Sequence, residues 1–152
     1  MDSANTEMII SCITPDVLVV EHGPKTPELL FLGIEFHGYS GMEKYLEALS
    51  QSLKIHKFEY IETSASNAND VDVVYVKGAG EFEYKETGKK WEEMFVSQFE
   101  IVKGKIVRYD VMNHVCRHGY LEYFPLYSIE QYLHLFQKSP ITPNPLFYLL
   151  NL

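Results

Sequence analysis

Four polar residues have side chains that could do chemistry in this sequence: Asp110, His114, His22 and Asn113. Asp110 and His114 lie on a polar strand that we predict for residues 105–116. If Asp110 faces an apolar cavity, its pKa should rise, and the carboxylate could then act as a general base. Histidine titrates near neutral pH, so His22 and His114 facing the same cavity could shuttle a proton. Asn113 could hydrogen-bond a carbonyl group of a bound molecule.

Each of these residues also has a purely structural interpretation. Asp110 could face outward and pair with Arg108 or with solvent. Either histidine could be a surface residue or a hydrogen-bonded structural one, and Asn113 could satisfy backbone groups at the strand end. The residue types alone leave both interpretations open.

The alternation of His114, Cys116 and His118 invites a metal interpretation, which strand geometry opposes. Residues four apart on a strand lie about 13 Å apart, too far to share one zinc ion with bonds of about 2 Å. Cys116 has no base and orienting group that could activate it as a nucleophile. We therefore predict no metal site and no covalent catalysis at this cysteine.

Composition and charge limit the class of protein. The chain has 152 residues, 46% of them hydrophobic and 14% aromatic, and a net charge of −8. That length and hydrophobic content predict one folded domain over residues 1–152. The acidic balance excludes nucleic acid as a natural partner. No apolar run reaches the roughly 20 residues that span a bilayer, and the N-terminal residues do not resemble a signal peptide. Two unpaired cysteines favour a reducing, cytoplasmic location.

The first half of the chain predicts elements around one clear helix. Residues 5–13 predict a short helix closed by Pro15, and residues 17–21 a strand, whereas residues 29–36 are ambiguous. Ser40 to Glu43 has the pattern of a capping box. The helix that it would open carries one apolar stripe, formed by Met42, Tyr45, Leu46, Leu49 and Leu53. Residues 58–63 predict another strand.

Three long strands follow, over residues 71–84, 91–102 and 105–116. Gly78 and Gly80 should bend the first of them, because glycines inside a strand mark bulges or bends. A bent, twisted meander of this kind is expected to curve around an interior. A second capping box, at residues 128–131, predicts a C-terminal helix before an apolar tail at residues 146–152. We divide the domain into a core, 1–120, and a C-terminal helix and tail, 121–152.

The order of these elements resembles the nuclear-transport-factor-two-like superfamily, in its polyketide-cyclase-like (SnoaL-type) and ketosteroid-isomerase-like branch. Three segments carry the resemblance: residues 36–38 before the capped helix, residues 87–91, and residues 99–110 with the phrase F-x-I-x-x-G-K-I. The resemblance implies an α+β fold in which a curved antiparallel sheet wraps around helices to form a cone with an interior pocket. It also implies a hydrophobic small-molecule ligand, homodimers and chemistry without a cofactor.

The resemblance also implies which residues line the pocket. The substrate-binding candidates are Asn113, Phe95, Ser97, Phe99, Phe82, Tyr109, Gly78 and Gly80. The two glycines stand where the epoxide-hydrolase branch has an Arg and an Asp, so that mechanism is excluded, and we expect them to widen the pocket. Glu93 shares the inward face of its strand, but we expect it to be solvated near the mouth. Trp91 and Tyr109 fit a core or a dimer surface equally well.

Two functions fit this pattern best, and a third, a partner-binding protein like the transport factor itself, would need an exposed apolar groove. The first is a cofactor-independent isomerase, cyclase or dehydratase that acts by proton transfer on a polyketide- or terpenoid-like molecule in secondary metabolism. Its catalytic residues would be Asp110, His114 and His22, although relatives carry their carboxylate at the position of Val111. The second is a non-catalytic ligand-binding or dimeric assembly module.

The chain also lacks the long first helix of the family, so we expect the C-terminal helix to act as a lid or dimer element.

Overall fold

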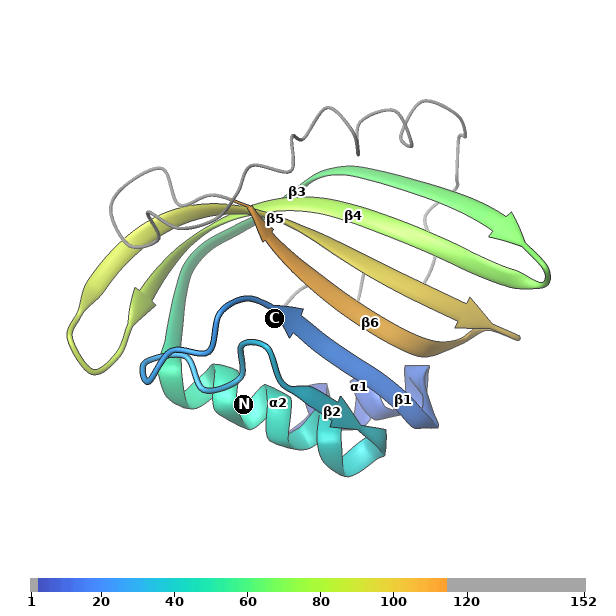
Figure 1. Ribbon diagram of the computed structural model, residues 1–152, viewed down its shortest axis with the longest axis horizontal. Coiled ribbons are helices and arrows are strands. Elements are labelled where there is room, and N and C mark those ends of the chain that lie inside the picture. The colour runs from blue at the N-terminus through green and yellow to red at the C-terminus, as the bar shows by residue number, and fades with distance from the viewer. Residues whose placement is uncertain (1–2, 115–152) are drawn as a thin grey trace.

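The computed structural model describes residues 3–114, which form two helices and one six-stranded sheet. In chain order the elements are α1 (Ser3–Cys12), β1 (Ile13–His22), β2 (Glu35–His37), α2 (Gly38–Ser52), β3 (Leu53–Ala68), β4 (Val71–Tyr84), β5 (Lys89–Val102) and β6 (Lys105–His114). The long strands arch over the helices (Figure 1). The predicted C-terminal helix and tail, Cys116 and His118 lie outside the described residues.

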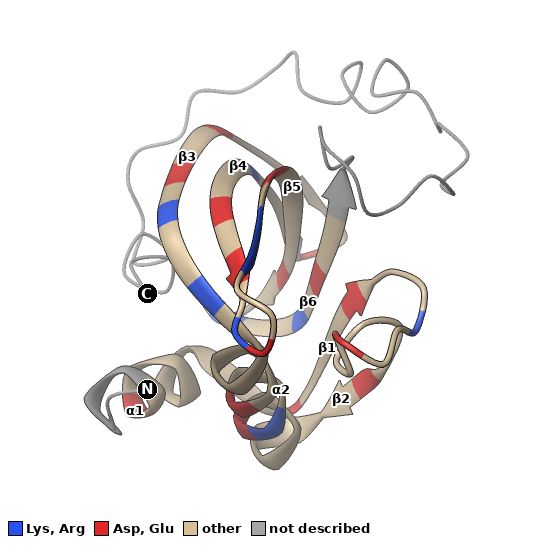
Figure 2. Ribbon diagram, turned by 90° about the vertical axis from the view of Figure 1, so that its left-hand side faces the viewer, with Lys and Arg blue, Asp and Glu red and all other residues tan. Residues whose placement is uncertain are grey.

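The sheet has the strand order β2-β1-β6-β5-β4-β3. Neighbouring strands are antiparallel except for β1 and β6, which run parallel. Figure 2 shows how strongly the sheet curls, with α2 beneath its open side. The predicted α+β architecture, a curved and mostly antiparallel sheet around helices, is confirmed.

Helix α2 packs most of its predicted apolar stripe against the sheet, but Leu53 lies after the end of the helix and begins β3. Met42, Tyr45 and Leu46 are buried, as expected for an amphipathic helix that covers a core. The predicted capping box is wrong, because the helix begins at Gly38 and its N-cap, His37, makes no side-chain capping hydrogen bond. Gly38 has a φ of +68°, and a Cβ there would stand 2.7 Å from the Pro15 carbonyl oxygen. The entry to the helix therefore depends on a glycine.

Strand β4 has the predicted bounds, and β3 is longer than predicted. The bulges that we expected at the glycines of β4 lie in its partner β3, where the register shifts after Ile55 and again after Tyr60. Gly78 and Gly80 pair with Tyr60 and Phe58, between those two shifts. Bulges increase local twist, so this part of the sheet is strongly curled.

The core lies between the concave face of the sheet and the two helices. It brings together Ile9 of α1, Val17 and Val19 of β1, and Met42 of α2 with residues of β4, β5 and β6. Residues 29–36, which the sequence left ambiguous, form turns and the start of β2, with Phe31 fully buried. Among the described residues, no helix is long and apolar enough to span a membrane.

Candidate functional site

A cavity of about 330 Å³ lies between the concave face of the sheet and helix α2. Its lining is mostly apolar and includes Phe31, Leu46 and Phe58. This volume falls in the range of small-molecule sites. The cavity is therefore the place to look for chemistry.

A bulge in β6 decides which of its residues face the cavity. Glu100 of β5 pairs with Arg108, whereas Ile101 pairs with Ile106, so Val107 is an extra residue in β6. Simple alternation from Ile106 would turn Asp110 inward. The bulge reverses the alternation, because a shift of one residue exchanges the two faces of a strand. Ile106, Tyr109 and Val111 consequently line the cavity, and Asp110 does not.

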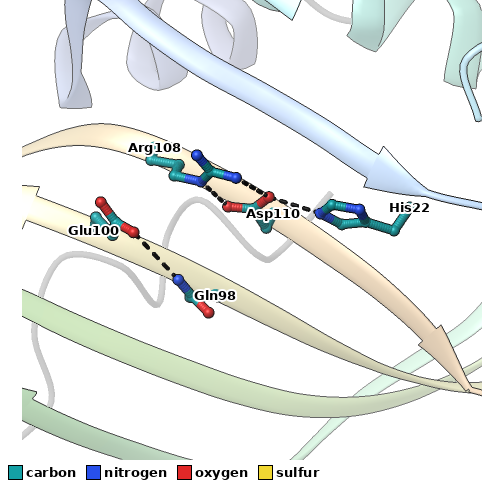
Figure 3. A network of polar contacts seen from close by, with 5 residues as sticks. All are labelled: His22, Gln98, Glu100, Arg108 and Asp110. Carbon is teal, nitrogen blue, oxygen red and sulfur yellow. Dashed lines mark hydrogen bonds and ion pairs between the residues drawn. The ribbon is translucent and has the colours of Figure 1, made fainter. Parts of the chain in front are cut away.

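Asp110 instead forms a polar network on the opposite face of the sheet (Figure 3). His22 Nε2 lies 2.8 Å from Asp110 Oδ1, and Arg108 donates two hydrogen bonds to the same carboxylate, one of them from Nη2 at 3.0 Å. On the neighbouring strand β5, the Gln98 side chain donates a hydrogen bond to the Glu100 carboxylate. The prediction that Asp110 and His22 face the pocket is wrong, and the outward, Arg108-paired interpretation describes the aspartate.

The charge state of Asp110 agrees with a structural role. Burial raises the pKa of its carboxyl, but hydrogen bonds from Arg108 and His22 outweigh this effect and lower the pKa overall. The same pairing raises the pKa of Arg108. A carboxylate held ionised by a guanidinium is a weak base, which argues against Asp110 as the general base.

Asn113 and His114 lie at the end of β6. Their backbones pair with Phe95 and Met94 of β5. Their side chains lie outside the described part of the structure, so the catalytic role of His114 and the binding role of Asn113 stay predictions.

The predicted wall of the pocket is present. Phe82, Phe95, Ser97, Phe99 and Tyr109 all line the cavity, and their role in binding a substrate stays a prediction. Phe99 and Tyr109 stack face to face with ring centroids 4.8 Å apart. This stacking fixes the phenol ring at the side of the cavity.

Gly78 and Gly80 do not widen the cavity, contrary to our expectation. The ring of Phe95 lies over Gly78 and that of Phe82 over Gly80, each with its Cε2 atom 2.6 Å from where a Cβ would stand. Neither glycine lines the cavity. The space that they leave on β4 is filled by aromatic rings of the protein itself.

One polar network inside the cavity was missed at the sequence level. Tyr45 of α2 donates a hydrogen bond of 2.7 Å to Glu21 Oε2 of β1, and both residues are buried. The Tyr109 hydroxyl hydrogen-bonds with Tyr45 and with Ser97. Burial, followed by the nearby Glu21 charge, raises the pKa of Tyr45 well above its usual value. Burial likewise raises the pKa of Tyr109, to about 12, so both phenols stay protonated at neutral pH.

Glu93 is the second polar feature of the cavity, and the sequence indicated its inward position but not its role. Its carboxylate lies in the cavity wall and accepts a 2.9 Å hydrogen bond from Trp91 Nε1. Burial raises the pKa of Glu93 to about 7, the Trp91 hydrogen bond opposes this, and the Glu21 charge adds to it. Glu93 lies on the inward face as predicted, but it is half-buried rather than fully solvated. Glu93 can change its charge at neutral pH inside an apolar cavity, which is the property expected of a general acid–base group.

Sequence signals for both glutamates exist. Glu21 continues the alternation of the buried residues Val17 and Val19 along β1, and Glu93 continues that of Phe95 and Ser97 along β5. Within residues 3–114, no three His, Cys, Asp or Glu side chains come together as metal ligands would.

Several solved structures share this fold at low sequence identity. An NTF2-like protein from Burkholderia xenovorans has a TM-score of 0.56 and 16% identity, over 73% of this chain and 78% of that one. A protein from Catenulispora acidiphila with a ketosteroid isomerase-like fold, in complex with trimethylamine, has a TM-score of 0.54 and 12% identity over 72% and 75%. A candidate polyketide cyclase from Xanthomonas campestris has a TM-score of 0.53 and 12% identity over 73% and 79%.

The similarity lies in the structure. Neither a protein-family model nor a curated protein sequence matches the chain. Identities of this size show a shared fold and nothing finer. The chain therefore has the NTF2-like cone fold of the ketosteroid-isomerase-like and polyketide-cyclase-like proteins.

Proposed function

We propose that the cavity binds a hydrophobic small molecule and catalyses proton transfer within it without a cofactor, with Glu93 as the acid–base residue. One observation carries this proposal: Glu93 lies in an apolar cavity with its pKa raised to about 7. A group with this pKa can both take and return a proton at neutral pH. The geometry supports Glu93 in the role that the sequence assigned to Asp110.

The chemistry that fits is isomerisation or cyclisation of a carbonyl compound. The Glu93 carboxylate would take a proton from a carbon next to the carbonyl, and the C–H electron pair would move to the carbonyl oxygen as an enolate. The Tyr109 hydroxyl would donate to that oxygen as a neutral hydrogen-bonding group of the lining, whereas Tyr45 already donates its only hydroxyl proton to Glu21. Glu93 would then return the proton at another carbon, which completes an isomerisation.

Three finer expectations from the sequence belong to this proposal. The ligand would have a bulky polyketide- or terpenoid-like framework from secondary metabolism, because the cavity wall is dominated by aromatic and aliphatic side chains. The protein would work in the cytoplasm as a homodimer, as many proteins of this fold do. The Catenulispora acidiphila protein in complex with trimethylamine supports small-molecule binding by the fold.

Deuterium exchange tests the proton transfer directly. A panel of cyclic β,γ-unsaturated ketones is incubated with the protein in D2O, and NMR follows label incorporation and double-bond migration. We expect wild type to catalyse exchange and Glu93→Gln to lose at least about 100-fold in rate, a usual contribution for acid–base groups. Asp110→Asn, which removes a carboxylate from the opposite face, should keep the wild-type rate.

Two results would contradict the catalytic proposal. Equal exchange by wild type and Glu93→Gln would remove the assignment of Glu93. Ligands that bind without any exchange would favour the alternative, a non-catalytic binding module, with which the hydrogen bond from Tyr45 to Glu21 is also compatible.

A further inference from the structure

Carboxylates outnumber ammonium groups among the described residues that line the cavity. Glu21 of β1 and Glu93 of β5 contribute carboxylates, and their charges are close enough to interact. Lys85 is the one cationic residue in the described lining, but it is exposed and donates a hydrogen bond to the Ser50 carbonyl oxygen. The remaining titratable groups are the tyrosines 45, 60 and 109, whose pKa values are all raised, so they stay neutral.

Aromatic rings surround the Glu93 carboxylate. Glu93 pairs across the sheet with Gly80, and the ring of Phe82 fills the space above that glycine. Trp91 donates its indole N–H to Glu93 and lies 5.8 Å from Phe82 between ring centroids. Phe95, two residues along β5, lines the same wall. The carboxylate therefore lies among aromatic residues, and Trp91 presents its N–H edge to it.

These two features favour a positive charge over a neutral or negative one. A cation gains Coulomb attraction from a carboxylate in a medium of low effective dielectric constant, and it gains cation–π attraction from the rings. An anion would meet two carboxylates. A neutral ligand would gain neither of these attractions.

We propose that the ligand of this cavity is a hydrophobic cation, an amine or ammonium compound whose nitrogen lies beside the Glu93 carboxylate among the rings of Trp91 and Phe82. This inference rests on the small-molecule cavity of the proposed function, and it is independent of the proton transfer. The bound charge would also hold Glu93 ionised, which is the form that a base needs.

A pair of isosteric probes tests the charge preference. Phenyltrimethylammonium and tert-butylbenzene have nearly the same shape, and they differ by one positive charge. Binding is followed by the fluorescence of Trp91, the only tryptophan of the chain, and by calorimetry. At pH 8 we expect the cation to bind at least tenfold more tightly than the neutral probe. At pH 6 this advantage should shrink, because Glu93 becomes protonated.

Matched variants assign the effect to one carboxylate. Glu93→Gln keeps an acceptor for Trp91 and should abolish the charge preference while leaving tert-butylbenzene affinity within a few fold. Glu100→Gln, which removes the same charge from the opposite face of the sheet, should bind both probes as wild type does.

The outcomes separate this inference from the proposed function. If tert-butylbenzene binds as tightly as the cation to wild type, the cation inference fails and the small-molecule cavity stands. If neither probe binds, both fail. A charge preference that survives in Glu93→Gln would overturn the placement of the nitrogen beside this residue.

Discussion

Glu93 combines a functional property with a cost in stability. Its pKa is about 7 in the folded protein and about 4.3 in an unfolded chain. Between these values the folded state retains a proton that the unfolded state releases, so the free energy of unfolding should fall as the pH rises. Above pH 7 Glu93 is ionised in both states, and the full cost of its burial in the folded state is present.

The first prediction follows from this sign. Glu93→Gln should be more stable than wild type at pH 8 by up to about 4 kcal/mol, since each unit of pKa shift corresponds to about 1.4 kcal/mol. The gain should disappear as the pH approaches 4, where wild-type Glu93 is neutral in both states. Urea denaturation of both proteins at pH 4, 6 and 8 measures it. A gain that is constant with pH would show that the raised pKa is not its cause.

Asp110 should behave in the opposite way. Its folded pKa is lowered, so the ionised carboxylate stabilises the fold above the unfolded pKa of about 3.9, and this contribution is lost as the pH falls through the lower folded pKa. Asp110→Asn should cost on the order of 1–3 kcal/mol at pH 7, the range for hydrogen bonds to charged groups. The cost should shrink near pH 3.

The same variant separates stability from function. Asp110→Asn should keep ligand binding in the cavity, because the Arg108–Asp110–His22 network lies on the other face of the sheet. Chemical denaturation at the two pH values and probe binding at pH 8 measure the two properties. Lost binding in a folded Asp110→Asn protein would contradict this placement.

At the residue scale, sequence reasoning found the right strand but the wrong face. Without the extra residue Val107, simple alternation along β6 would have predicted the face on which Asp110 lies. Val107 reverses the orientation of Asp110. A bulge depends on the pairing of β5 with β6, and local sequence does not record that pairing. Glu93 was visible as an inward position, but its burial depends on how α2 and the sheet close around it.

Among the elements, β4 and its two glycines give the clearest case of packing constraint. Gly78→Ala would place a methyl group against the Phe95 ring and 3.1 Å from the Glu59 carbonyl oxygen. Overpacking of this kind costs about 1–3 kcal/mol. We predict a loss in that range in the free energy of unfolding, measured by urea denaturation.

A double-mutant cycle identifies the cause of that loss. Phe95→Ala removes the ring and should itself be destabilising, but Gly78→Ala should cost less in the Phe95→Ala background than in wild type. Additive effects would mean that the ring above Gly78 is not the obstacle.

Elements were predicted well where a local pattern suffices. The apolar stripe of α2 and the polar-to-apolar alternation of β5 are local, and both were predicted. The start of α2 was placed late, because Ser40 and Glu43 resemble a capping box whereas the chain turns at Gly38. The parallel pairing of β1 with β6 joins distant segments, and nothing in either segment specifies that direction.

At the scale of the whole molecule, the described residues share one hydrophobic core, and the cavity is part of it. The core cluster joins both helices to β1, β4, β5 and β6, and several of its members, among them Ile13, Tyr45 and Phe99, also line the cavity. A cavity built into the only described core cannot lose its walls while the rest of the fold remains. The cavity and the fold should therefore unfold together.

The last prediction uses Trp91 as a local probe of the cavity. Its fluorescence and the far-UV circular dichroism of the whole chain should follow the same urea transition, with one midpoint and one slope. Val17→Ala, a change at a buried position away from the cavity lining, should cost about 1–3 kcal/mol and shift both transitions equally. A Trp91 transition at lower urea than the circular dichroism transition would show that the cavity wall opens as a separate unit. In that case the raised pKa of Glu93 would depend on local closure of β4 and β5 rather than on the global fold, and ligand affinity would fall before the protein unfolds.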